Sequence, residues 1–457
     1  MTVRLLQGHV TEVLRSLPAE SVHCVVTSPP YYGLRAYGTE PQVWDELEEL
    51  CEHKWVPSRA APTKLAMEGN TDIAKVPKLA REGKAPNGFT CPYCNAWKGE
   101  LGLEPTMGLF LQHIVQVFRE VRRVLRKDGT LWLNIGDSYN RSGGAGGDYG
   151  PGGLREGQPR YPGRSEPSLK AKDLMGIPWR TALALQADGW WLRADIIWFK
   201  KNGMPEPARG RPVMSHEYLF LLTRSERCFY DADAIREKNG EEADAEEYER
   251  ALGKAWANNP DRLGMGNLKT LKARTHPLGR NRRSVWEINT EACPEAHFAT
   301  FPQALVRPCI QAGTSEVGTC ASCGASWARV TKPSPEYAKV LGKSYTRHED
   351  DLGEGMSSHP KGFKAVSADR VTIGWRPTCK CGCDQTVPAT VLDPFSGSGT
   401  TALVAYKLGR DAIGIDLKEE YHAIARKRLA EANEENACRE TNRPRQRNIF
   451  ELISEEQ

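Results

Sequence analysis

Apolar positions along this chain alternate between the period of about 3.6 typical of helices and the period of two typical of strands. Near the N-terminus, residues 3–8 and 22–27 have the composition of short strands, and residues 11–17 between them form a predicted helix. Residues 108–125 then carry apolar side chains at helical spacing, and residues 130–135 form another apolar strand. Strands and helices in this order are typical of a doubly wound α/β sheet.

The rest of the chain continues the pattern. The Asp128-Gly129 pair predicts a turn between the helix at 108–125 and the strand that follows it. A predicted helix at 178–188 leads into two apolar strands that form an antiparallel hairpin. The predicted fold class is therefore α/β, with a doubly wound, mostly parallel, Rossmann-like sheet and a closing hairpin. The remaining predicted elements are strands at 192–199, 216–223, 390–393 and 411–416, and helices at 301–312, 400–408 and 419–432.

Segments with weak periodicity interrupt this core and predict its division along the chain. Residues 51–99 are rich in Pro, Lys and Gly, and residues 314–388 carry cysteines, so both are predicted insertions. Residues 225–295 are polar and form the best candidate for a region that recognises a target. The predicted division is core at 1–50, insertion at 51–99, core at 100–224, recognition region at 225–295, core helix at 296–313, second insertion at 314–388 and core at 389–457.

Composition is that of a globular protein without a membrane partner. Hydrophobic residues make up 39% of the 457 positions and charged residues 26%, and the formal net charge is +4. The N-terminal residues lack the basic and apolar regions of a signal peptide, and no stretch has the length of a membrane helix. We therefore expect a cytoplasmic protein.

The 13 cysteines are many for a cytoplasmic chain, where disulfides are disfavoured, so their clusters indicate metal sites. Paired Cys-x-x-Cys spacing supplies the soft ligands that tetrahedral zinc prefers. Both clusters lie in predicted insertions, which indicates a structural role for the metal. The predicted ligands are Cys51, His53, Cys91 and Cys94 in one site, and Cys320, Cys323, Cys379 and Cys381 in the other, with Cys383 as the alternative to Cys381.

A glycine-containing turn near the C-terminus has the features of a cofactor site. Residues Asp393 to Thr401 read Asp-Pro-Phe-Ser-Gly-Ser-Gly-Thr-Thr, between a predicted strand and a predicted helix. Gly397 and Gly399 allow a tight turn, and the helix N-terminus offers N–H donors to a carboxylate. Asp416 ends the next predicted strand about 20 positions further on, where an acid accepts hydrogen bonds from ribose hydroxyls. The spacing matches neither the dinucleotide nor the Walker pattern, which argues against both of those ligands.

A second loop, near the N-terminus, reads Thr-Ser-Pro-Pro-Tyr-Tyr-Gly. Pro29 and Pro30 end the strand at 22–27, so the loop begins at its carboxyl end. Ligands of open parallel sheets bind at that edge. Ser28 to Tyr31 is therefore predicted to contact a ligand, and it is the candidate catalytic segment.

The two motifs and their order, catalytic loop first and cofactor turn last, resemble the permuted (beta) class of S-adenosylmethionine-dependent DNA amino-methyltransferases, which modify cytosine N4 or adenine N6. The resemblance implies a methyltransferase sheet with S-adenosylmethionine as cofactor. It also places the segment before the helix at 301–312 on the methionine moiety, and the first strand-turn, here Gly8-His9, on the adenine. The implied cofactor-binding residues are Asp393, Pro394, Phe395, Gly397, Gly399, Thr400, Asp416, Thr300, Phe301 and His9.

An exocyclic amine is a poor nucleophile because its lone pair is conjugated into the ring. Ser28 Oγ and the Pro29 carbonyl are expected to accept its hydrogens, and Tyr31 to stack on the extruded base. In the resembling family, Ser-Pro-Pro-Tyr is the version associated with cytosine N4, so Ser28 favours that product over adenine N6. The remaining contribution to catalysis is the alignment of amine, methyl carbon and sulfur.

The expected substrate is duplex DNA, with a restriction endonuclease as a possible partner. The glycine-rich residues 142–163 are either a flexible linker or a loop that orders over bound DNA. An RNA methyltransferase and an inactive zinc-bearing DNA-binding protein are the competing hypotheses. Neither the recognition sequence nor the oligomeric state follows from these patterns.

Overall fold

The structure is a computed structural model that describes residues 1–34, 36–44, 51–58, 88–140, 166, 168–203, 208–237, 281–291, 301–333 and 370–441. The chain divides into two compact units. The larger comprises Met1–Cys228, Ser284–Ile310 and Pro388–Gln457, and the smaller comprises Phe229–Arg283 and Gln311–Val387. The glycine-rich segment 142–163 and most of the expected recognition region lie outside the described residues.

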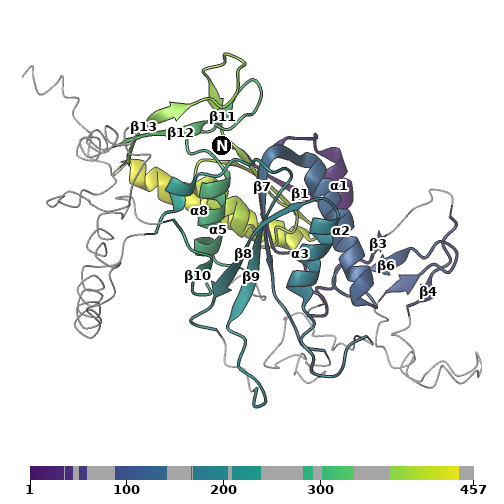
Figure 1. Ribbon diagram of the computed structural model, residues 1–457. Coiled ribbons are helices and arrows are strands. Elements are labelled where there is room, and N and C mark those ends of the chain that lie inside the picture. The colour runs from purple at the N-terminus through teal and green to yellow at the C-terminus, as the bar shows by residue number, and fades with distance from the viewer. Residues whose placement is uncertain are drawn as a thin grey trace, which may run out of the picture. The chain divides into compact units, whose positions relative to one another are not determined.

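An eight-stranded sheet forms the centre of the larger unit (Figure 1). Its first five strands are parallel to one another, β9 is antiparallel to both β7 and β8, and β10 is parallel to β8. The predicted mostly parallel α/β sheet with a closing hairpin is thus confirmed. The strands, in spatial order, are β1 (Val3–Gln7), β16 (Asp411–Asp416), β15 (Thr390–Asp393), β2 (Val22–Thr27), β7 (Leu125–Ile135), β9 (His216–Thr223), β8 (Trp191–Phe199) and β10 (Val285–Glu287).

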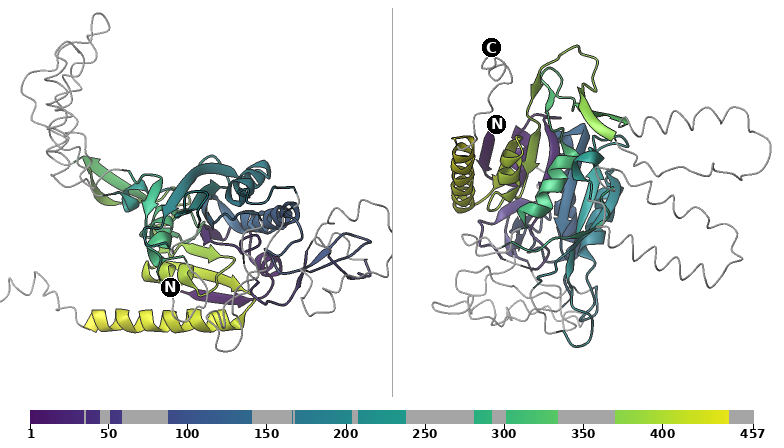
Figure 2. Two further views of the ribbon diagram at one scale, coloured as in Figure 1. Left: turned by 90° about the horizontal axis from the view of Figure 1, so that it is seen from below. Right: turned by 90° about the vertical axis from the view of Figure 1, so that its left-hand side faces the viewer.

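Helices flank this sheet. One group of neighbours is α1 (Val10–Ser16), α2 (Met107–Val124) and α3 (Ile177–Ala187), and another is α7 (Thr400–Lys407) and α8 (Glu419–Thr441). Figure 2 shows α8 as a long helix that runs beside β1 and β16. A further helix, α5, covers Gln303–Gly313.

Helix α2 illustrates how the sequence pattern produces this packing. Its N-cap, Thr106, accepts a hydrogen bond from the Leu109 amide through its hydroxyl at 3.3 Å. Phe110, Ile114 and Val117 follow at helical spacing and are completely buried. The amphipathic stripe predicted from the sequence is therefore the face that α2 turns to the core.

Three details differ from the sequence-based expectation. The predicted turn at Asp128-Gly129 is wrong, because β7 begins at Leu125 and runs through both residues. A register shift in its pairing with β2 accommodates them. Strand β10 was not predicted, since three residues are too short to show periodicity. Helix α8 continues to Thr441, beyond its predicted end at 432.

A small antiparallel sheet combines one strand that precedes the first predicted insertion with three strands inside it. Its order is β3 (Gln42–Trp44), β6 (Trp97–Gly99), β5 (Phe89–Thr90) and β4 (Val56–Pro57). The smaller unit contains two further pairs, β11 (Thr319–Cys320) with β14 (Thr386–Val387), and β12 (Ala328–Pro333) with β13 (Arg370–Arg376). In the same unit Arg329 forms a 2.9 Å salt bridge with the buried Asp231.

No helix in the described part of the chain is long and apolar enough to cross a membrane.

Candidate active site

Loops from several strands meet around one cavity of about 650 Å³ in the larger unit. The loops after β2 and β15 are neighbours because these strands pair in parallel, which brings their carboxyl ends to one edge of the sheet. Strands from the N-terminal part and from the C-terminal part of the chain thus contribute to a single site. The residues that line the cavity include His9, Ser28, Pro29, Pro30, Tyr31, Trp44, Glu100, Asn134, Trp198, Lys200, Glu217, Thr290, Phe301, Pro394, Phe395, Ser396, Gly397, Thr400 and Asp416.

Asp393 lies beneath the two motif loops and holds them together. Its buried carboxylate accepts hydrogen bonds from Thr27 Oγ1 at 2.6 Å and from Thr401 Oγ1 at 2.8 Å. The Phe395 amide donates a third at 3.0 Å. Burial raises the pKa of Asp393 to about 6. The three hydrogen bonds act in the opposite direction and lower it, but their effect is smaller. Asp393 does not line the cavity.

The glycine turn follows directly. Gly397 and Gly399 have φ angles of +49° and +74°, which favour glycine. A Cβ on Gly399 would lie 2.5 Å from the Ala425 Cβ, so Gly399 serves packing against α8 and does not line the cavity. The Gly397 amide donates to Asp416 Oδ2 at 2.9 Å, and the Lys418 amide to Oδ1 at the same distance. Asp416 faces the cavity, and burial raises its pKa.

Two buried polar atoms of this wall have no hydrogen-bond partner within the described residues, namely His9 Nε2 and Ser396 Oγ. The other ring nitrogen of His9 lies 2.8 Å from Thr11 Oγ1, and the ring meets Trp44 edge-on at 4.7 Å. Burial, with a smaller effect from Arg15, lowers the pKa of His9 to about 4, so the ring is neutral at pH 7. Buried polar atoms are normally satisfied, so these two atoms fit a bound polar ligand.

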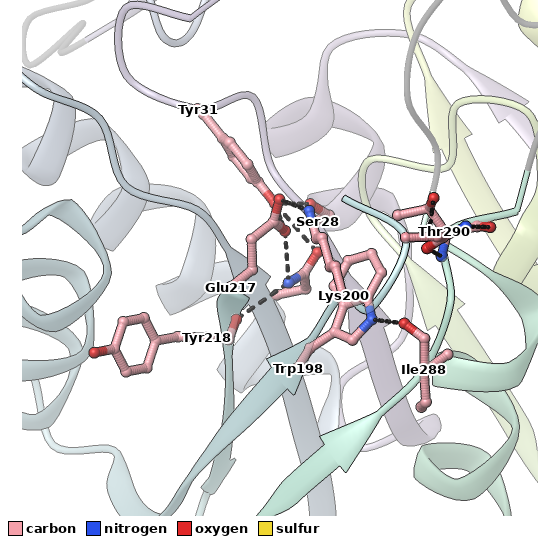
Figure 3. Close-up of polar contacts among 10 residues, drawn as sticks. Ser28, Tyr31, Trp198, Lys200, Glu217, Tyr218, Ile288 and Thr290 are labelled. Carbon is pink, nitrogen blue, oxygen red and sulfur yellow. Dashed lines mark hydrogen bonds and ion pairs between the residues drawn. The ribbon is translucent and has the colours of Figure 1, made fainter. Parts of the chain in front are cut away.

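The catalytic segment lies in the same cavity. Figure 3 shows the polar contacts of Ser28 and Tyr31 in this segment. Ser28 Oγ donates to the Tyr31 hydroxyl at 3.2 Å, and that hydroxyl donates to Glu217 Oε2 at 2.8 Å. Burial and the Glu217 carboxylate raise the pKa of Tyr31 well above its usual value, so Tyr31 keeps its hydrogen. Asn134 Nδ2 also donates to Glu217 Oε2, at 3.2 Å.

Lys200 completes this network from β8. Its ammonium pairs with Glu217 Oε1 and lies 4.3 Å from the centre of the Trp198 ring. Trp198 is held by a 2.8 Å hydrogen bond from its indole nitrogen to the Ile288 carbonyl. The Lys200 and Glu217 side chains are each about four-fifths buried, with exposures of 21% and 17%.

The sequence analysis missed these network residues because they belong to no motif. Asn134 lies at the carboxyl end of β7, Lys200 directly after β8, and Glu217 at the start of the antiparallel β9. All three positions lie at the same edge of the sheet as the motif loops. Polar residues at strand ends on that edge were the available signal.

Most residues expected at the site line the cavity. These are Ser28, Pro29, Pro30, Tyr31, His9, Phe301, Pro394, Phe395, Gly397, Thr400 and Asp416. Asp393 and Gly399 support the turn from beneath, as described above. Thr300 lies outside the described residues.

The predicted metal ligands come together in two groups. Each ligand atom lies within 4.8 Å of the others in its group, and the groups are Cys51, His53, Cys91 and Cys94, and Cys320, Cys323, Cys379 and Cys381. Cys383 is outside the second group, and its thiol lies 3.7 Å from the Gln385 carbonyl. The amide of Cys323 and the thiol of Cys381 lower the pKa of Cys320 to about 6, whereas the hydrogen bond with the Cys381 thiol raises the pKa of Cys379 to about 12, so the thiolate of this group lies on Cys320.

Comparison with known proteins gives the family. Residues 22–321 and 387–427 match the N6/N4 family model described as DNA methylase. The chain is 34% identical to the type II methyltransferase M.XycI of Xanthomonas campestris pv. cyanopsidis, over 94% of this chain and 88% of the relative. It is 32% identical to M.Cfr9I of Citrobacter freundii, over 93% and 87% of the two chains, and 31% identical to M.SmaI of Serratia marcescens, over 93% and 90%. The chain therefore belongs to the N6/N4 DNA methylase family, and it is an S-adenosylmethionine-dependent DNA methyltransferase.

Proposed function

We propose that this enzyme methylates the exocyclic N4 amine of cytosine in double-stranded DNA. The observation that carries the proposal is Ser28 at the head of the Pro-Pro-Tyr loop, in one cavity with the glycine turn. A neutral hydroxyl stands where the adenine-directed version of this loop carries an aspartate. The choice of cytosine over adenine rests on that residue.

The hydrogen bonds of Ser28 support its role as an acceptor. A serine hydroxyl has one hydrogen and two lone pairs, and the Ser28 hydrogen points to Tyr31. Because Tyr31 in turn donates to Glu217, the Ser28 hydrogen stays engaged and its lone pairs remain for the amine. Together with the Pro29 carbonyl, Ser28 would hold both amine hydrogens and turn the nitrogen lone pair toward the methyl group.

The opposite wall fits the cofactor. Asp416 would accept hydrogen bonds from the ribose hydroxyls, since each carboxylate oxygen retains a lone pair beyond its backbone bond. His9 Nε2 and Ser396 Oγ would find their missing partners on the polar groups of the cofactor. Phe395 and Phe301 supply apolar surface. S-adenosylmethionine supplies the electrophilic methyl group when bound.

An exocyclic amine stacked and paired inside a duplex is out of reach of a cavity-bound methyl donor, so the proposed reaction requires base flipping. Tyr31 would form an aromatic wall for the flipped base, with its hydroxyl anchored on Glu217. Lys200 and Glu217 place a donor and acceptors at the same end of the cavity. Cytosine and adenine both have an acceptor nitrogen and a donor amine on their pairing edges, so this pair fits either base, and the choice of cytosine still rests on Ser28.

We also propose a restriction endonuclease as biological partner, since the relatives named above are type II methyltransferases. Two structural zinc ions are the proposed occupants of the cysteine groups, because both groups offer four soft or borderline ligands.

Mass spectrometry of nucleosides tests the proposal. DNA incubated with the protein and methyl-labelled S-adenosylmethionine should yield labelled N4-methylcytosine. Labelled N6-methyladenine would keep the mechanism and overturn the base assignment. Label in RNA but not in duplex DNA, or in neither, would refute the proposed substrate.

A further inference from the structure

The two Cys-x-x-Cys segments have the same backbone conformation. The Asn95 amide donates to the Cys91 carbonyl at 2.9 Å, and the Cys91 amide to the Ala96 carbonyl at 2.8 Å. Around Cys320 the same pair of bonds recurs, and Gly324 occupies the position of Asn95. Asn95 and Gly324 have φ angles of +61° and +70°. This shared tight turn directs both thiols of each segment to one point.

The distances in the first group suit tetrahedral zinc. Bonds of about 2.3 Å at tetrahedral angles separate two sulfurs by about 3.8 Å. The Sγ atoms of Cys51 and Cys91 are 3.9 Å apart, and Cys94 Sγ lies 3.3 Å from His53 Nδ1. The four residues, called the insertion site below, therefore form a ligand set that needs little rearrangement.

The small sheet around the insertion site has few other sources of stability. Strands β4 and β5 are two residues long and β3 and β6 three. Sheets of such short strands have only marginal stability unless a metal ion or a disulfide links them. Cys51 and His53 precede β4, and Cys91 and Cys94 lie between β5 and β6, so one ion would join the segment before the edge strand β4 to the turn between the two central strands.

The same sheet supports the active-site cavity. Trp97 on β6 pairs with Trp44 on β3, and both rings stack on the buried His113, at 5.5 and 5.0 Å. Trp44 lines the cavity and contacts His9 edge-on. Glu100, directly after β6, lines the cavity as well. Only two residues separate Cys94 from Trp97. Loss of order around Cys94 would therefore extend to Trp97 and to the cavity wall that it supports.

We propose that zinc at the insertion site holds this wall of the cavity in its binding conformation, so that zinc and cofactor favour each other's binding. The identity of the cofactor rests on the proposed function. Such coupling is reciprocal by thermodynamic necessity. The second cysteine group belongs to the unit that contributes no residue to the described cavity lining. It therefore offers a matched control.

The test compares Cys94→Ser with Cys323→Ser in the full chain. Elemental analysis should find about two zinc ions in the wild type and about one in each variant. Calorimetry with S-adenosylhomocysteine should show an affinity loss of about ten-fold for Cys94→Ser and an unchanged affinity for Cys323→Ser. The proposal is overturned if Cys94→Ser keeps both ions, if it loses one without weaker binding, or if Cys323→Ser weakens binding equally.

Hydrogen exchange separates this inference from the proposed function, because it needs no cofactor. Chelation of zinc from the wild type should increase exchange in peptides covering residues 88–103, while residues 390–416 stay protected. Added zinc should restore the protection. Unchanged exchange at 88–103 after metal loss would refute the inference even if cofactor binding and methylation are normal. Because this measurement uses the wild-type protein, it tests the inference even if Cys94→Ser fails to fold.

Discussion

Thr27 donates a 2.6 Å hydrogen bond to the carboxylate of Asp393, across 366 positions of the chain. Thr27 is the last residue of β2, and Asp393 is the last residue of β15. The catalytic loop begins one residue after the first, and the glycine turn begins one residue after the second. One buried carboxylate therefore sets the relative position of the two motifs.

Asp393→Asn should change how stability depends on pH. The pKa of Asp393 rises from 3.8 to about 6 on folding, so the folded state holds this proton more tightly. The unfolding free energy of the wild type therefore falls as pH rises from about 3 to 7, by about 3 kcal/mol from this group. Asparagine does not titrate, so the Tm of the variant relative to wild type should increase between pH 4 and pH 7. A Tm difference that is constant over this range would contradict the assignment.

Ser28→Ala should lower kcat about ten- to a hundred-fold, because the amine loses one acceptor in a buried site. The affinity for S-adenosylhomocysteine should change little, since the glycine turn is untouched. Ser21→Ala is the matched control, because that hydroxyl bonds only to the exposed Pro18 carbonyl in the described contacts. Equal turnover of Ser28→Ala and wild type would refute the acceptor role.

Glu217→Gln should reduce kcat by a similar factor, about ten-fold or more, since it weakens the anchor of Tyr31 and leaves the Lys200 cation unpaired. Adding Lys200→Met should recover part of the loss, because the double variant has no unpaired buried charge. Lys201→Met is the control, since its ion pair with Glu287 is more than half exposed, at 69% and 57%. Strictly additive losses for Glu217→Gln and Lys200→Met would show that the pair does not act as a unit.

Asp416→Ala should weaken cofactor binding about ten- to a hundred-fold, because ribose hydroxyls and the Gly397 amide both lose an acceptor. Asp416→Asn should lose less, since one side-chain oxygen remains. Calorimetry with S-adenosylhomocysteine measures both variants. Affinities equal to wild type in both would exclude the ribose contact.

Much of this fold followed from local patterns. The helical spacing of Phe110, Ile114 and Val117 predicted α2 with its buried face, and prolines after β2 predicted the catalytic loop. One local signal gave a wrong prediction: Asp128 and Gly129 form no separate turn but lie in an irregular stretch of β7, between the residues that pair with β2. Turn propensity alone did not decide the outcome, because strand pairing on either side of the two residues continues the strand through them.

The sequence by itself determined the family, the two motifs and the residues able to bind metal, because these depend on residue type and short spacing. Only the tertiary structure decided that Asp393 supports the site from beneath, and that Lys200 and Glu217 complete it. Their meeting depends on which strands become neighbours in the sheet. Strand order is set by the packing of the whole core, and no local stretch of sequence encodes it.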